Sequence, residues 1–370
     1  MTAQTLPAEQ STTPSAERVR RELDKRLQLG LQYIAVNASG LLVDYAGGVR
    51  DAATGEPVTR DTLFLSASSS KVLTAAAVLT LAERGALRLD DPLARYVPYQ
   101  PYGERVNLSQ LLSHTSGVPN PLPLKWLHTA AEHARFSEDA ALRGVLQRHP
   151  TLQFEPGTRY AYSNLAYWLL GKVIEAVSGL CFDAYLQQSI REPLQIDARD
   201  LSCEFLDAAQ QARGHVRRWS LLGLALPLLV DATILSRPAG RWARFEHLHM
   251  NGPAYGGVRA SARGYARFLQ DLLQPRSRVL GDAMKRLFFA PQRARSGRLL
   301  PTTLGWHTGS LAGERYLSKP RGGHGFHSNL RIYPARSLAT VFLSNQMRAS
   351  EAQIERFADG LDRALLDAAR

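Results

Sequence analysis

The chain has 370 residues, 45% of them hydrophobic and 21% charged, which is typical of a soluble globular protein with one large domain or two moderate ones. Its two cysteines, Cys181 and Cys203, argue against a disulfide framework or a cysteine-based metal site, and the N-terminus lacks the basic and apolar segments of a signal peptide, so we expect a cytoplasmic protein. The net charge of +12 comes with no nucleic-acid recognition motif and no interleaving of basic and aromatic residues, so we do not expect a nucleic-acid partner.

The N-terminal part predicts a tail, a helix and a hairpin. Residues 1–14 are polar, and we expect them to be disordered. Helical spacing follows over 15–29. Two short strands are predicted at 31–36 and 41–45, and the turn Asn-Ala-Ser-Gly between them predicts a hairpin.

The stretch 63–84, LFLSASSSKVLTAAAVLTLAER, predicts a short apolar strand, a serine cluster and a long helix. The helix is apolar on nearly every face, so we expect it to be buried. Lys71 lies in its first turn, where an unpaired buried ammonium would be costly. Ser68 lies three residues earlier on the same face, at a helix N-terminus whose free N–H groups favour a developing negative charge.

This pair suits nucleophilic catalysis. A serine hydroxyl needs a base to attack at neutral pH, and a desolvated lysine can be that base. The alternative is that Ser66, Ser68 or Ser69 is a helix N-cap and that Lys71 reaches the surface.

The middle of the chain predicts helices separated by loops, at 108–113, 138–148, 164–179 and 261–273. His114 follows the first of them in the sequence His-Thr-Ser-Gly, and we expect it to stabilise its loop through hydrogen bonds.

Tyr162-Ser163-Asn164 lies where a loop enters the third of these helices, a position from which side chains can point into a cleft. A tyrosine beside an ammonium can relay protons between a nucleophile and a leaving group. Asn164 carries an amide that both donates and accepts, which suits orienting a lysine and a substrate carbonyl. The alternative is that Tyr162 belongs to an aromatic cluster with Tyr160 and Tyr167.

Residues 211–300 hold 16 Lys and Arg against four Asp and Glu, a surplus of 12. The most apolar run of the chain, 219–230 (WSLLGLALPLLV), lies within this region, too short for a transmembrane helix and interrupted by Pro227. One interpretation is a surface element that makes peripheral contact with an anionic membrane. The other, which we favour, is an ordinary buried helix beside a solvated arginine-rich face.

Three strands are predicted near the C-terminus, at 303–308, 325–333 and 338–344, followed by a helix whose capping box starts at Ser350 and is completed by Gln353. Two strands at the start and three at the end predict an α/β (α+β) fold, in which helices flank one antiparallel sheet of about five strands from both chain ends.

We therefore expect a single catalytic domain over 15–370. Its α/β lobe would cover about 15–65 and 275–370, and an inserted, mostly helical lobe would cover about 66–274. The cleft between the lobes is the natural place for a site.

The sequence KPRGGHGF, which starts at Lys319, comes just before the second C-terminal strand. Glycines allow a substrate to approach the backbone, and the N–H of Gly322 or Gly323 could complete an oxyanion hole with that of Ser68. Lys319 would add positive charge. The alternative is a glycine-rich turn between strands.

We also looked for a Ser-His-Asp hydrolase motif and for a histidine metal site, and the sequence favours neither. No Gly-x-Ser-x-Gly string is present for a Ser-His-Asp hydrolase. His247 with His249, and His324 with His327, could be metal pairs, but no third ligand stands at a suggestive spacing. We therefore expect structural histidines, no metal and no cofactor.

Ser68-x-x-Lys71, Tyr162-x-Asn164 and the glycine sequence after Lys319, in that order, together resemble the serine β-lactamase and penicillin-binding-protein superfamily. The resemblance is closest to its class C branch, which includes family VIII carboxylesterases and peptidases that release D-amino acids. Four further stretches are similar, TGEPVTRDTLFLSASSSK, LLSHTSG, EPGTRYAYSNLAYWLLGKVIE and YGGVRASARGYARFL, so that the likeness covers most of residues 16–366.

The resemblance implies an α/β lobe with a helical lobe, and a hydrolase of small-molecule esters or amides. It implies that Ser68 is the acylated nucleophile and Lys71 its base. It implies further that Tyr162 transfers protons to the leaving group and from water, and that Asn164 positions these groups.

The third motif departs from the Lys-Thr-Gly or His-x-Gly of the family, because Pro320 and Arg321 follow Lys319. The threonine hydroxyl that holds a β-lactam carboxylate is missing, and Pro320 removes a strand donor, although Arg321 could supply the anion contact. We therefore predict a carboxylesterase for short acyl chains. The alternatives are a β-lactamase or D-amino-acid peptidase acting on amides, and a catalytically weak binding or assembly-forming member of the fold.

Overall fold

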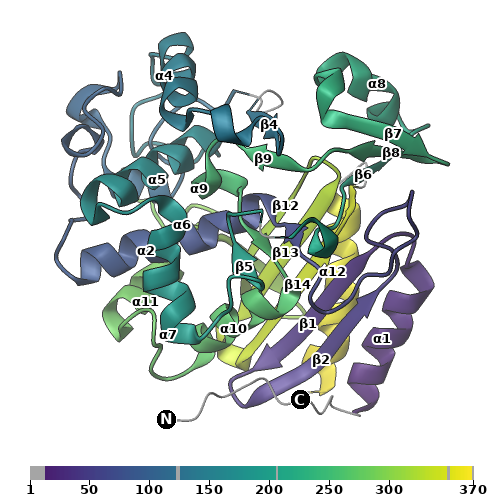
Figure 1. Ribbon diagram of the computed structural model, residues 1–370. Coiled ribbons are helices and arrows are strands. Elements are labelled where there is room, and N and C mark those ends of the chain that lie inside the picture. The colour runs from purple at the N-terminus through teal and green to yellow at the C-terminus, as the bar shows by residue number, and fades with distance from the viewer. Residues whose placement is uncertain (1–12, 122–125, 206, 348–350, 369–370) are drawn as a thin grey trace.

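A six-stranded antiparallel sheet built from both ends of the chain carries the fold (Figure 1). The computed structural model describes residues 13–121, 126–205, 207–347 and 351–368. The strands of this sheet, in spatial order, are β11 (His307–Leu311), β12 (Glu314–Gly323), β13 (Phe326–Tyr333), β14 (Leu338–Ser344), β1 (Leu31–Asn37) and β2 (Gly40–Gly47). The register of β1 on β14, from Leu31 opposite Ser344 to Asn37 opposite Leu338, joins the two chain ends.

The sheet confirms the predicted antiparallel architecture and contains one strand, β12, that the sequence analysis missed. Residues 319–323 are expected to form a glycine-rich segment before a strand, but they continue β12 and pair with β13. Proline and glycine disfavour strands locally, and the pairing overrides that preference. His324 and Gly325 form the two-residue turn that follows, with φ of +53° and +85°. The strand predicted at 303–308 is displaced toward the C-terminus, to β11.

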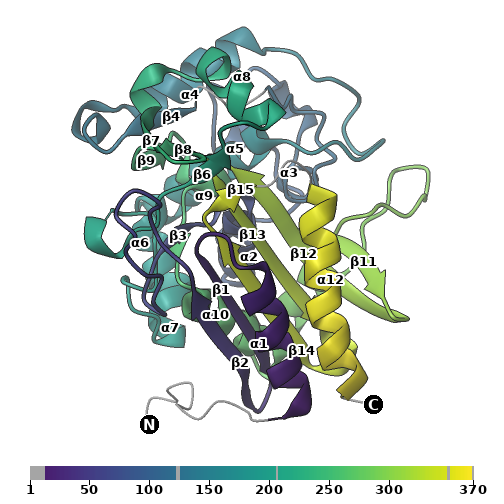
Figure 2. The same ribbon diagram turned by 90° about the vertical axis from the view of Figure 1, so that its right-hand side faces the viewer.

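Helices cover both faces of this sheet. α1 (Pro14–Arg26) and α12 (Glu351–Ala368) lie side by side on one face, where Figure 2 shows them in front of the strands. α10 (Ala262–Leu273) packs on the other face against β1 and β14. Neighbouring residues of β1 alternate between the two cores, because Cβ atoms alternate across a strand: Tyr33 faces α1 and α12, and Ile34 faces the opposite core.

The helix ends concern two predictions, the N-terminal tail over residues 1–14 and the capping box that starts at Ser350. Thr13 caps α1 and accepts from the N–H of Ala16, so Pro14 belongs to the helix and not to the tail. Residues 1–12 and the capping-box residue Ser350 lie outside the described residues.

The predicted central helix is α2 (Ser70–Glu83), and it is buried from Ser70 to Leu81. It packs against α5 (Asn164–Ser178), α9 (Pro253–Gly256) and α11 (Asp282–Phe289). Further helices of the middle part are α3 (Leu108–Leu112), α4 (Glu138–Arg148), α6 (Phe182–Leu186) and α7 (Glu192–Leu194). Two small sheets complete it, β3 (Phe64–Leu65) with β10 (Arg259–Ala260) and β5 (Leu201–Ser202), and β4 (Leu127–Thr129) with β9 (Leu248–Met250).

A four-stranded sheet at the upper right of Figure 1 carries the apolar run that the sequence singled out. It consists of β15 (Gln346–Met347), β6 (His215–Arg217), β8 (Trp242–Phe245) and β7 (Leu235–Ala239). The apolar run forms α8 (Leu221–Leu229), which Ser220 caps by accepting from the N–H of Gly223. The favoured expectation of a buried helix is wrong, because Leu221 and Leu228 are 90% and 89% exposed.

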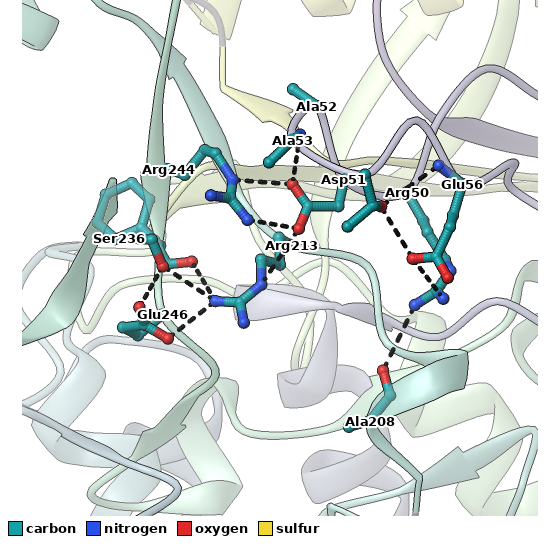
Figure 3. A network of polar contacts seen from close by, with 12 residues as sticks. Arg50, Asp51, Ala52, Ala53, Glu56, Ala208, Arg213, Ser236, Arg244 and Glu246 are labelled. Carbon is teal, nitrogen blue, oxygen red and sulfur yellow. Dashed lines mark hydrogen bonds and ion pairs between the residues drawn. The ribbon is translucent and has the colours of Figure 1, made fainter. Parts of the chain in front are cut away.

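A network of ion pairs fastens the four-stranded sheet to the loop after β2 (Figure 3). Arg244 of β8 holds the Asp51 carboxylate with two hydrogen bonds, of 2.8 Å from Nε and 2.5 Å from Nη2. Arg213 links Asp51 to Glu246. Burial by itself would raise the pKa of Asp51, but the nearby His215 and hydrogen bonds from Arg244 and the N–H of Ala53 hold that pKa well below its usual value. The sheet that carries α8 is thus bound tightly to the main body.

Within the described ranges, no single helix has the length and apolar composition needed to cross a membrane. The segments Asn164–Ser178 and Phe182–Leu194 meet that test only as a pair, and they are bent by 74°.

Candidate active site

Ser68 lies in a single turn of 3-10 helix, Ala67–Ser69, that leads into α2. Ala67 has a φ of +46°, a left-handed conformation that a residue with a side chain adopts only under tertiary constraint. That constraint comes from its neighbours, because the Ser66 hydroxyl donates to the carbonyl of Val258 at 2.7 Å and the Ser69 hydroxyl donates to that of Lys319 at 3.1 Å. No side-chain capping bond is made by Ser66 or Ser69, so the N-cap alternative is wrong.

Lys71 is fully buried, so the alternative in which it reaches the surface is wrong. Its ammonium nitrogen donates to Ser68 Oγ at 3.2 Å, to Asn164 Oδ1 at 2.8 Å and to the carbonyl of Tyr255 at 2.5 Å. The contribution of Tyr255, from α9, escaped the sequence analysis, because a backbone carbonyl carries no residue-specific signal.

Tyr162 stands directly before α5 and points to the serine. Its hydroxyl lies 2.6 Å from Ser68 Oγ, and its ring packs against that of His114, with 4.4 Å between centroids and a tilt of 37° between the ring planes. Nδ1 of His114 accepts from the N–H of Ser163, which confirms the expected role of this histidine in its loop. Tyr160 and Tyr167 contact His114 as well, so the aromatic cluster is present around a tyrosine that also reaches Ser68.

Asn164 opens α5 and is held in place by its own backbone. Its N–H donates to Oδ1 of Asn120 at 2.9 Å, and its side-chain oxygen receives the Lys71 bond. The cap of α5 is Ser163, whose hydroxyl oxygen accepts from the N–H of Ala166. Asn120 also lines the cavity described below, and the sequence analysis did not find it.

The third motif approaches Ser68 as part of β12. β11 pairs only with residues 314–318, so the segment from Lys319 to Gly323 extends beyond it and packs against the Ala67–Ser69 turn. The Lys319 ammonium lies 5.4 Å from the centroid of the Tyr162 ring, on which Lys71 also lies, at 5.0 Å. Lys319 is fully buried. The Arg321 side chain, considered above as an anion contact, lies outside the described residues.

A cavity of about 300 Å³ opens beside Ser68. Tyr162, Asn164, Gly322 and Gly323 share its lining with Ser68, so the structure brings these predicted residues together. The rest of its wall is mostly apolar and comes from α8 and its supporting sheet: Val216, Leu222, Leu226, Leu229, Val230, Phe245 and Met347. His324 also lines the cavity, and burial lowers its pKa to about 4, so that its imidazole is neutral at pH 7.

The sequence analysis paired His249 with His247 as a possible metal pair. In the structure His249 lies instead with His128 and His133, and one nitrogen of each ring lies within 4.8 Å of the others. Nε2 of His128 is 2.8 Å from Nδ1 of His133, closer than two nitrogens that share a tetrahedral zinc at about 2.1 Å each. The His249 ring stacks on that of His133 at 3.8 Å. In this arrangement the group is a hydrogen-bonded pair with a third stacked ring.

Comparison with known proteins places the chain. A family model described as Beta-lactamase matches residues 16–363. Penicillin-binding protein 4* of Bacillus subtilis (strain 168) is 26% identical over 337 residues, which are 89% of this chain and 71% of that protein. Protein flp of Staphylococcus aureus (strain COL) is 27% identical over 183 residues, and the match spans 36% of that relative.

Solved structures share the fold. The D-amino acid amidase from Ochrobactrum anthropi SV3 superposes with a TM-score of 0.76 at 18% identity, covering 96% of this chain and 99% of that one. The class C β-lactamase from Rhodobacter sphaeroides superposes with a TM-score of 0.70 at 21% identity, covering 96% and 100%. Proteins of this fold, amidases and β-lactamases among them, are serine hydrolases. Because the family model spans nearly the whole chain, and the fold agrees with that of its neighbours, the chain belongs to the β-lactamase family.

Proposed function

We propose that the chain is a carboxylesterase that transfers an acyl group to Ser68 and then to water. One observation carries this proposal: Ser68 Oγ lies 2.6 Å from Tyr162 Oη and 3.2 Å from Lys71 Nζ, at the wall of a mostly apolar cavity. A hydroxyl held between an amine and a phenol at hydrogen-bond distance can lose its proton as it attacks.

In the first half of the reaction, Ser68 Oγ forms a bond to the ester carbonyl carbon while its proton passes to Lys71. The lysine acts in its neutral form, in which its nitrogen donates to Asn164 and to the carbonyl of Tyr255 and accepts from Ser68. The carbonyl electrons move to the oxygen, which the N–H of Ser68 and that of Gly322 or Gly323 stabilise. The carbon–oxygen bond to the alcohol then breaks. The departing alkoxide takes a proton through Tyr162, so that an alcohol leaves and an acyl-enzyme remains.

In the second half, a water molecule attacks the acyl-enzyme and gives its proton to the Tyr162–Lys71 pair. The acid is released and Ser68 regains its proton. Asn164 keeps the Lys71 nitrogen directed at Ser68 throughout, since it accepts from the same nitrogen at 2.8 Å. Positive charge from Lys71 and Lys319 around the Tyr162 ring stabilises negative charge on the tyrosine oxygen.

The ester preference is supported by what lines the cavity and by what β12 lacks. The wall formed by Leu222, Leu226 and Phe245 suits an apolar acyl or alcohol group. Pro320 replaces the threonine whose hydroxyl would bind the carboxylate of a β-lactam in the resembling family. The leaving group of an ester is an alkoxide, which depends less on a proton donor than the amine leaving group of an amide does.

Amide hydrolysis is the second candidate, and the buried Lys319 next to Tyr162 favours it because a cation behind the cavity wall attracts the carboxylate that a β-lactam or peptide substrate carries. The structural neighbours named as a D-amino acid amidase and a class C β-lactamase have that chemistry in their names. The third candidate is a binding member of the fold with weak catalysis. It requires that Ser68 does not complete the hydrolysis of a bound substrate.

Intact mass spectrometry and turnover separate the three. We expect one equivalent of a fluorophosphonate on the wild type and none on Ser68→Ala, together with a burst of nitrophenol from nitrophenyl butyrate. Faster turnover of nitrocefin or of a D-amino acid amide than of the ester would replace the esterase with the amide hydrolase. A stable label without turnover of any of these substrates would support the binding member.

A further inference from the structure

The outer face of α8 is an exposed apolar surface. Trp219 and Leu221 are 71% and 90% exposed at its start, and Leu228 is 89% exposed at its end. Leu224 and Leu229 lie exposed between and beside them. The other large apolar residues that are exposed in the described part of the chain, Leu180, Leu287 and Leu299, stand far apart in the sequence. An apolar patch of this kind marks an interaction site.

The inner face of the same helix is apolar as well, and it closes the cavity. Leu222, Leu226 and Val230 line the cavity together with Ser68. A helix that is apolar all round is normally buried on every side. α8 lies at the edge of the molecule (Figure 1). One of its apolar sides packs on the protein, and the other is exposed to solvent and available to a binding partner.

The charges around the outer face of α8 indicate which kind of partner binds there. Four exposed arginines lie on the segments near α8: Arg217 and Arg218 directly precede it, and Arg237 and Arg241 lie on the β7–β8 hairpin of its supporting sheet. The N–H of Arg218 donates to the carbonyl of Arg241, so two of these residues are adjacent in space. Asp231 is the only acidic residue between positions 217 and 241.

Aromatic and basic side chains beside exposed leucines form the pattern of an element that lies in a membrane interface. The Arg218 guanidinium lies over the Trp219 ring, 4.9 Å from its centroid, so a polar rim and an apolar anchor meet at the start of α8. Each basic residue near an anionic lipid surface adds to the binding. A protein partner would need a matched surface, whereas lipid supplies apolar contact and negative charge together.

The platform beneath α8 is rigid enough to present this face. The ion pairs of Asp51 with Arg244 and with Arg213 tie β8 and the segment before β6 to the loop after β2 (Figure 3). We propose that the outer face of α8, formed by Trp219, Leu221, Leu224 and Leu228 with Arg217, Arg218 and Arg241, docks on an anionic membrane surface. The helix that closes the cavity beside Ser68 would then lie against the bilayer.

Tryptophan fluorescence tests this docking directly. The chain has five tryptophans, all in described positions, and four of them, Trp126, Trp168, Trp242 and Trp306, are buried. A blue shift on adding vesicles therefore reports Trp219. With vesicles of phosphatidylcholine and phosphatidylglycerol at low salt, we expect a blue shift and flotation of the wild type. Trp219→Phe should still float but lose the shift, and pure phosphatidylcholine or 0.5 M salt should weaken binding at least tenfold.

Two pairs of variants separate the apolar and the charged contributions. Leu221→Ser/Leu228→Ser and Arg218→Gln/Arg241→Gln should each weaken binding at least tenfold. Their matched controls, Leu180→Ser/Leu299→Ser and Arg293→Gln/Arg298→Gln, change exposed residues of the same types elsewhere and should bind as the wild type does. Unchanged far-ultraviolet circular dichroism shows that each variant is folded.

The outcome does not depend on the proposed esterase, because Ser68→Ala should bind vesicles as the wild type does. Absence of flotation at low salt, or equal losses in the control pairs, overturns the proposal. A wild type that sediments as a dimer without binding vesicles also overturns it, if Leu221→Ser/Leu228→Ser is a monomer, because a second copy would then cover the face.

Discussion

Lys71 donates a 2.8 Å hydrogen bond to Oδ1 of Asn164, 93 residues further along the chain. This bond joins the first turns of two buried helices, α2 and α5, and directs the lysine nitrogen toward Ser68. Tyr162, two residues before Asn164, approaches the same serine from the other side. The nucleophile, the base and the proton relay of the proposed mechanism are therefore one unit.

Residues that act as a unit lose activity together. Lys71→Met, which keeps most of the side-chain length and removes the charge, should lower ester turnover on the order of a hundredfold or more, and so should Tyr162→Phe. The double variant should be little worse than either single one. Initial rates with nitrophenyl butyrate measure this, and Lys285→Met, at a lysine far from the site in the sequence, serves as the control. Wild-type rates in Lys71→Met would remove lysine as the base.

Ala67 should tolerate glycine better than an alanine of a regular helix does. At a φ of +46° an alanine is strained, and glycine adopts this conformation freely, which offsets the entropy that glycine loses on folding. Ala67→Gly is thus expected to leave the melting temperature unchanged or to raise it. Ala75→Gly, in the middle of α2, should cost about 1–2 kcal/mol. Equal losses in the two variants would contradict the strain at Ala67.

Breaking the Asp51–Arg244 pair should destabilise the protein strongly. Arg244→Met removes both hydrogen bonds to a buried carboxylate and should cost about 3–5 kcal/mol in urea unfolding at pH 7. Asp51→Asn/Arg244→Met should recover part of that loss, because the buried carboxylate that kept only its longer contact with Arg213 is then neutral. The exposed pair Arg88–Asp90 is the control, and Arg88→Met should leave the urea midpoint nearly unchanged, because solvent screens an exposed ion pair. A double variant as unstable as Arg244→Met would show that the charge is not the cause.

His249 should make the fold sensitive to mild acid. Burial and the nearby Arg259 lower its pKa to about 3, against about 6.5 in the unfolded chain. Between pH 6.5 and 3 the unfolded chain binds a proton that the folded protein does not, so stability falls as the pH falls through this window. The loss from pH 7 to pH 5 should be on the order of 2 kcal/mol.

Urea unfolding at pH 7 and pH 5 measures this contribution. His249→Gln should lose less stability over that interval than the wild type does, because glutamine does not titrate. An identical loss in His249→Gln would assign the acid sensitivity to other groups.

Local chemistry determined a large part of this protein. The apolar run of α2 predicts a buried helix because no face of the helix is polar enough to be exposed to solvent. The turn residues between β1 and β2 predict their hairpin. Ser68, Lys71, Tyr162 and Asn164 were identifiable because their residue types suit one reaction and occur at helix starts, where backbone groups are free. Such signals depend on a few neighbouring residues, so they are visible in the sequence.

Other features depended on contacts between distant segments. β12 contains Pro320 and two glycines, and it becomes a strand only because β13 supplies its hydrogen bonds. The Tyr255 carbonyl reaches Lys71 as a backbone group, which residue type does not encode, and the Asn120 side chain reaches the N–H of Asn164 from 44 residues earlier in the chain. α8 was identifiable as apolar, but which of its faces meets the cavity and which meets solvent depends on the sheet below it. Burial is a property of the whole packed chain, and for this reason only the tertiary structure decided it.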